Sequence, residues 1–158
     1  MKNVLLVISK KGVSEEALLR AVLAAKENKS TLYAFCGLGS GAADDASDKF
    51  TDIGFIGDKP SAQVSEAIMK DYRQRGYEEL GKVQIKCMEE GVVFEPLMEQ
   101  EGDFVESILS LVEGHSIALV VITGEKRSPL RRYLSKSPED ELKEKAGCEV
   151  EVFIEEDN

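Results

Sequence analysis

The sequence predicts one α/β domain with an open, five-stranded parallel sheet and helices on both faces. Short, β-branched apolar runs alternate along the 158 residues with segments of helical periodicity, which is typical of consecutive βα units. Two runs, 3–8 (NVLLVI) and 117–122 (IALVVI), are apolar almost throughout, as expected of strands covered on both faces. We place these two strands side by side at the centre of the sheet and predict the strand order 3-2-1-4-5.

The first helix follows strand 3–8 after a short connection. Ser14 is placed to cap it, because a serine side chain can accept a hydrogen bond from the unpaired N–H groups of a first helical turn. Apolar residues then recur at the spacing of one helical face at Leu18, Ala21, Val22 and Ala25. The run 31–36 (TLYAFC) predicts the second strand.

A long polar and glycine-bearing segment, 40–60, follows the second strand. It exceeds an ordinary βα connection, so we expect a functional flap or a partly disordered loop within the single domain 1–158. A helical pattern then runs from Ser61 towards Gly91. We expect this helix to bend or break near Gly76, since glycine weakens a helix interior.

The next βα unit is predicted over residues 92–113. Residues 92–98 (VVFEPLM) predict the third strand. Asp103 and Glu106 have the spacing of a capping box, in which the first side chain accepts from the helix N-terminus. They predict the start of a helix over 104–113.

The C-terminal part supplies the last helix and strand. Ser137 and Pro138 are typical of an N-cap and a first helical position. Glutamates alternate with apolar residues over 149–154 (EVEVFI), which predicts a half-exposed strand at the edge of the sheet. An acidic tail, 155–158, follows.

Charge and cysteine content restrict the partners. The chain has a net charge of −10, which argues against nucleic acid, because a duplex attracts basic surfaces. Residues 125–136 are the exception, with five basic residues against one acidic residue, and such segregation can focus a field on a small anion. The three cysteines form no C-x-x-C pattern, and no segment suggests a leader or a membrane span. We therefore expect a cytoplasmic protein.

The strand order predicts where a ligand would bind. Parallel strands with reversed order on either side of a central pair form a crevice at their carboxyl ends. Ser9 and Lys10 follow strand 3–8, whereas Gly124 and the basic segment follow strand 117–122. We expect these residues to line one anion site, with Arg127, Lys136 and Ser137 as further anion donors.

Five stretches together resemble the universal stress protein family over most of the chain except 40–60: VLLVIS, EEALLRAVLAA, EGDFVESIL, IALVVITG and AGCEVEVF. The resemblance implies the fold called adenine nucleotide alpha hydrolase-like and a role as a stress-response regulator. It also implies a homodimer formed through the last strand, 149–154. By the same analogy, backbone at Cys36 and Gly37 would face the base of a bound ATP or AMP.

The ATP-binding motif of that family is altered here. ATP-binding members have G-x-x-G, nine further residues and G-[ST], in which glycine amides surround the phosphates. Gly124 and Ser137 match, but Arg127 and Lys136 replace the second and third glycines, with a spacer one residue shorter than nine. Ser9 replaces an aspartate after the first strand.

Three readings of these changes stay open. Side-chain cations could replace the backbone amides as phosphate donors, which keeps a nucleotide site. Alternatively, the cradle is lost and the protein is a homodimeric interaction module. The basic segment could also be the solvated face of an amphipathic helix. No residues form an evident catalytic or metal site, and hydrolysis of ATP would require both an ordered metal and a positioned water.

Overall fold

The computed structural model describes residues 2–8, 12–36, 62–97, 103–125 and 138–155. They form one parallel sheet in the order β3-β2-β1-β4-β5, which confirms the predicted order. The strands are β1 (Asn3–Ile8), β2 (Thr31–Cys36), β3 (Val93–Leu97), β4 (Ile117–Glu125) and β5 (Glu149–Glu155).

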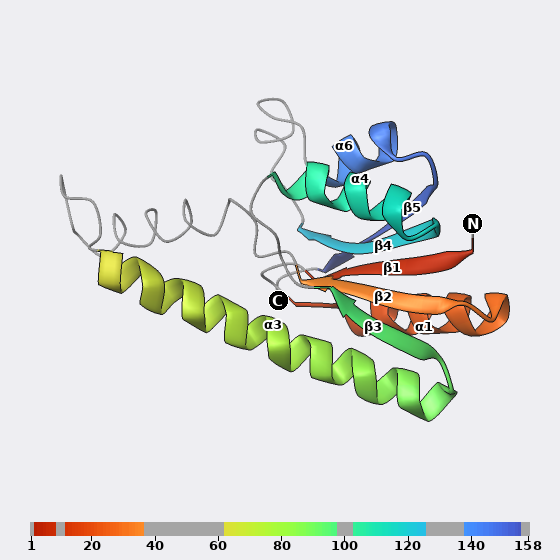
Figure 1. Cartoon of the computed structure of the whole chain (residues 1–158), viewed down its shortest axis with the longest axis horizontal. Coiled ribbons are helices and arrows are strands. Elements are labelled where there is room, and N and C mark those ends of the chain that lie inside the picture. The colour runs from red at the N-terminus through yellow and green to blue at the C-terminus, as the bar shows by residue number, and fades with distance from the viewer. Residues whose placement is uncertain (1, 9–11, 37–61, 98–102, 126–137, 156–158) are drawn as a thin grey trace.

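Helices cover both faces of this sheet, as predicted (Figure 1). The described helices are α1 (Glu15–Asn28), α3 (Ala62–Glu90), α4 (Phe104–Gly114) and α6 (Pro138–Lys145). The helices α1 and α3 pack on one face, and α4 and α6 pack on the other. None of these described helices combines the length and the apolar character that a membrane span requires.

Each face has its own apolar core, because successive side chains of a strand point to opposite sides. Leu6 and Ile8 of β1 face α1 and α3, whereas Leu5 and Val7 face α4 and α6. The two central strands are buried almost completely. The uniformly apolar sequences of these strands therefore indicated their position correctly.

The predicted caps of α1 and α4 are present, whereas the predicted N-cap Ser137 lies outside the described residues. The Ser14 hydroxyl accepts a hydrogen bond from the Ala17 N–H at 3.1 Å. At α4, the Asp103 carboxylate accepts from the N–H groups of Val105 and Glu106 at 2.8 and 3.2 Å. These bonds satisfy backbone donors that have no partner inside the helix.

The prediction of a bend or break near Gly76 was wrong, since α3 continues unbroken from Ala62 to Glu90. Gly76 is buried, and a β-carbon there would overlap Cys36 Sγ at the end of β2. The glycine therefore lets the helix lie close to the sheet. Tertiary packing of this helix offsets the low helix propensity of glycine.

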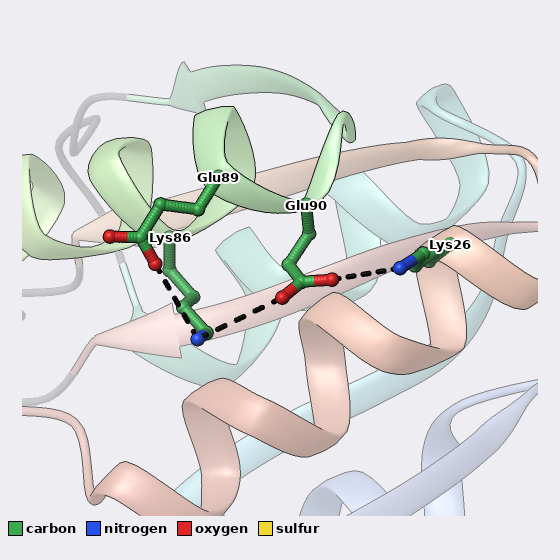
Figure 2. Close-up of polar contacts among 4 residues, drawn as sticks. All are labelled: Lys26, Lys86, Glu89 and Glu90. Atoms are coloured by element: carbon green, nitrogen blue, oxygen red, sulfur yellow. Dashed lines mark hydrogen bonds and ion pairs between the residues drawn. The ribbon is translucent and has the colours of Figure 1, made fainter.

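An ion pair between Lys26 and Glu90 connects α1 to the C-terminal end of α3, where Lys86 also pairs with its own helix (Figure 2). Lys26 Nζ lies 2.8 Å from Glu90 Oε2, and Lys86 Nζ lies 3.5 Å from Glu89 and 3.9 Å from Glu90. The hydrogen bond from Lys26 lowers the pKa of Glu90. The pairing therefore favours the fold at neutral pH and is lost as the pH falls through the folded-state pKa, although exposure and salt keep its contribution small.

Candidate functional site

The carboxyl ends of β1 and β4 lie side by side at the point where the strand order reverses. The segment that follows β1 is hydrogen-bonded to the end of β4. The Ser14 N–H donates to Thr123 Oγ1 at 3.2 Å, and Thr123 Oγ1 lies 3.5 Å from Ser14 Oγ. Thr123 is buried, so this contact fixes the N-terminus of α1 against the end of β4.

A carboxylate from α3 occupies the turn that leads into α1. Gly12 has φ +87°, and a β-carbon there would lie 3.1 Å from Glu79 Cδ. The Val13 N–H donates to Glu79 Oε2 at 3.2 Å. Glu79 Oε1 lies 2.9 Å from Lys82 Nζ, and this hydrogen bond raises the pKa of Lys82. Glu79 therefore takes a backbone donor that an anionic ligand could otherwise use.

A second carboxylate lies at the end of β4. A β-carbon on Gly124 would lie 3.2 Å from both Cγ and Cδ of Glu139. Glu139 belongs to the first turn of α6, whose Leu142 is fully buried against the sheet. Packing of Leu142 thus holds a carboxylate against the glycine where the sequence predicts a phosphate.

A model of the universal stress protein family matches residues 1–153. The chain belongs to the universal stress protein family. The match covers nearly the whole chain and so confirms the resemblance noted from the sequence. No curated protein sequence matches closely enough to count as a relative.

Solved universal stress proteins share the fold of this family member. One from Archaeoglobus fulgidus has a TM-score of 0.62 at 15% identity, covering 96% of this chain and 93% of that one. A structure of the A. fulgidus protein in complex with dAMP has a TM-score of 0.60 at 15% identity, covering 96% and 97%. One from Burkholderia pseudomallei has a TM-score of 0.57 at 17% identity, covering 94% of each chain. The adenine nucleotide alpha hydrolase-like fold is therefore shown.

Of the predicted site residues, the structure describes Cys36 and Gly124. Both lie at the carboxyl edge of the sheet, with β1 between them, because Cys36 pairs with Ile8. Cys36 is 3% exposed and its Sγ faces Gly76 of α3. A wall made by Cys36 would therefore be a backbone wall, as the sequence analysis assumed.

The other predicted site residues of this universal stress protein lie outside the described residues, and their roles stay predictions. They are Ser9, Lys10, Gly37, Arg127, Lys136 and Ser137.

Sequence reasoning missed the two carboxylates and the Ser14–Thr123 contact. Glu79 is 66 residues from Val13 in sequence, and no spacing rule links such distant positions. Thr123 carried a usable signal, since it is the first polar residue after a uniformly apolar strand. A polar side chain at such a strand end must find a hydrogen-bond partner when it is buried.

Apart from Cys36, the described cysteines and the histidine lie towards the opposite end of the sheet, since Cys87 is next to the start of β3 and Cys148 directly precedes β5. Burial raises the pKa of the Cys87 thiol to about 11, and burial together with Glu149 raises that of Cys148. Both thiols are therefore poor nucleophiles at neutral pH. His115 precedes β4, at the opposite end of the sheet. Within the described ranges, no three His, Cys, Asp or Glu residues are grouped as metal ligands.

Proposed function

We propose that this universal stress protein is a cytoplasmic stress-response regulator that binds an adenine nucleotide, ATP or AMP, between the ends of β1 and β4. The observation that carries the proposal is the Ser14–Thr123 hydrogen bond at 3.2 Å. It joins the N-cap of α1 to the end of β4 at the reversal of strand order, where open α/β sheets bind ligands. It also directs the N-terminus of α1, with its partial positive charge, towards that point.

The ligand class is supported by one relative and by the basic segment. The A. fulgidus protein of the same fold has been solved in complex with dAMP. In this chain, Lys10, Arg127, Lys136 and Ser137 would supply donors to phosphate, together with Ser9 and the backbone of Gly124. Backbone at Cys36 and Gly37 would form the base-facing wall.

A second candidate function is a homodimeric interaction module that binds no nucleotide. The carboxylates of Glu79 and Glu139 at the two glycines favour it, since they occupy positions that phosphate would need. The edge strand β5 offers the dimer contact, and its Ile154 is 54% exposed. Arg20 pairs with Glu151 at 2.9 Å, which reduces the repulsion expected between glutamates of two paired β5 strands.

A ligand-dependent change in melting temperature tests the nucleotide proposal. At AMP or ATP concentrations about one hundred times Kd, binding adds about 2.7 kcal/mol, which corresponds to a rise in Tm of about 5–10 °C for a domain of this size. Arg127→Ala and Lys136→Ala should each reduce the rise. Lys2→Ala is the matched control, because the exposed Lys2 lies at the opposite end of β1.

The opposite result selects the second candidate. If AMP, ATP and inorganic phosphate all leave the Tm unchanged at millimolar concentration, the nucleotide proposal fails. Light scattering that reports a dimer would then support the interaction module, and a substitution such as Ile154→Lys in β5 should dissociate it, because Ile154 is exposed and lies outside both core clusters.

A further inference from the structure

Two carboxylates from distant parts of the chain reach the start of α1 and the end of β4, at the same edge of the sheet. Glu79 comes from α3 and contacts Gly12 and the Val13 N–H. Glu139 comes from α6 and contacts Gly124. The Ser14–Thr123 hydrogen bond joins the start of α1 to the end of β4, so the two carboxylates lie on either side of this junction, one from each face of the sheet.

Each carboxylate places a negative charge of the protein next to a glycine. Glycine at a phosphate-binding turn leaves backbone N–H groups open to an anion. Here the Val13 N–H already donates to Glu79 at 3.2 Å. Glu139 lies so close to Gly124 that even a methyl group there would touch its carboxylate carbon at 3.2 Å. A phosphate that approached Gly124 would have to displace Glu139 or stay beside it.

The electrostatic cost of that approach rises with the charge of the ligand. Like charges a few ångströms apart repel strongly in a partly buried site and more weakly in water. A nucleoside has no phosphate and avoids the cost, and its hydroxyl groups can donate to a carboxylate. AMP carries fewer charges than ATP. The two carboxylates therefore disfavour ATP most, AMP less and adenosine least.

We propose that Glu139, supported by Glu79, competes with phosphate at Gly124 and so makes the site selective for a nucleoside or a monophosphate over a triphosphate. This inference rests on the proposed function, because it specifies the ligand of the same site. Glu139 is the principal determinant because Glu79 is already held by the Val13 N–H and Lys82.

Isothermal titration of the wild type, Glu139→Gln and Glu141→Gln with adenosine, AMP and ATP tests the inference. Glutamine keeps the shape of the side chain and removes its charge. Glu141 is the matched control: it lies on the same helix, about 200° around from Glu139, and its carboxylate is 3.0 Å from Lys145 Nζ. All three proteins should show the same circular dichroism.

The expected pattern is specific to charge and position. The wild type should bind adenosine or AMP more tightly than ATP. Glu139→Gln should raise the affinity for ATP by at least about tenfold and that for adenosine by less than about twofold. Glu141→Gln should leave all three affinities within about twofold of the wild type.

The remaining outcomes separate the two proposals. If the wild type binds these ligands and Glu139→Gln binds them with unchanged relative affinities, the inference is wrong and the proposed function stands. If only Glu139→Gln binds, Glu139 does block the site, but the proposed selectivity of the wild type and its proposed function are both wrong. If no variant binds any of the three ligands, both are wrong.

Discussion

Replacing Leu142 by alanine is expected to lower the free energy of unfolding by about 2–5 kcal/mol, as large-to-small changes in a packed core do. Leu142 is fully buried and belongs to the apolar cluster beneath α4 and α6, together with Ile108 and Ile122. The other residues of α6 that the structure describes are exposed or half-buried. This single side chain therefore anchors α6 to the sheet.

Urea denaturation of Leu142→Ala and Leu142→Met measures this effect. Methionine conserves most of the volume and should cost less than about 1.5 kcal/mol. Since α6 carries Glu139, Leu142→Ala should also weaken the contact between Glu139 and Gly124. An unchanged urea midpoint for Leu142→Ala would contradict the role of Leu142 as the anchor of α6.

Gly76→Ala is expected to destabilise the protein by about 1–3 kcal/mol, the usual cost of overpacking, although alanine is the better helix former by about 1 kcal/mol. The added methyl group would overlap Cys36 Sγ, which is itself buried. One of the two elements, α3 or β2, must therefore shift.

The glycine at position 81 provides the matched control. It lies in the same helix, and a β-carbon there would meet nothing within 4 Å, so Gly81→Ala should stabilise the protein by up to about 1 kcal/mol. Combining Gly76→Ala with Cys36→Ala should remove most of the penalty, because the clash needs both side chains. Equal penalties for Gly76→Ala in the two backgrounds would show that the clash with Cys36 is not the cause.

The sheet was predictable from the sequence because each strand carries its own burial pattern. Strands 3–8 and 117–122 are apolar on both faces, and only a central position buries both faces. The alternation of glutamates in 149–154 requires an edge, and the structure places β5 there. Local side-chain patterns thus indicated the two inner strands β1 and β4 and the edge strand β5.

The continuity of α3 and the carboxylates at the site were not predictable in this way. Gly76 reads as a helix breaker until its contact with Cys36, 40 positions away, is known. Glu79 and Glu139 look like ordinary solvated glutamates of their helices. Their roles depend on the way α3 and α6 pack on the sheet, which is a tertiary property. Sequence analysis therefore predicted which edge of the sheet would hold a site but not the carboxylates that lie there.

The charge around the proposed site decides which nucleotide could bind there. The five basic residues of 125–136 lie outside the described residues. The described glycines at this edge, Gly12 and Gly124, are faced by Glu79 and Glu139. A ligand of low charge satisfies both observations, because basic side chains can bind one phosphate while the carboxylates disfavour more. AMP is therefore the appropriate probe.

Titration of the isotopically labelled protein with AMP, followed by amide chemical shifts in two-dimensional NMR, tests the central claim most directly. The account predicts saturable shifts that are largest at the amides of Gly12, Val13, Ser14, Thr123 and Gly124. Amides at the opposite end of the sheet, such as His115, should move little. Shifts centred on that opposite end, or none at millimolar AMP, would contradict a nucleotide site between β1 and β4.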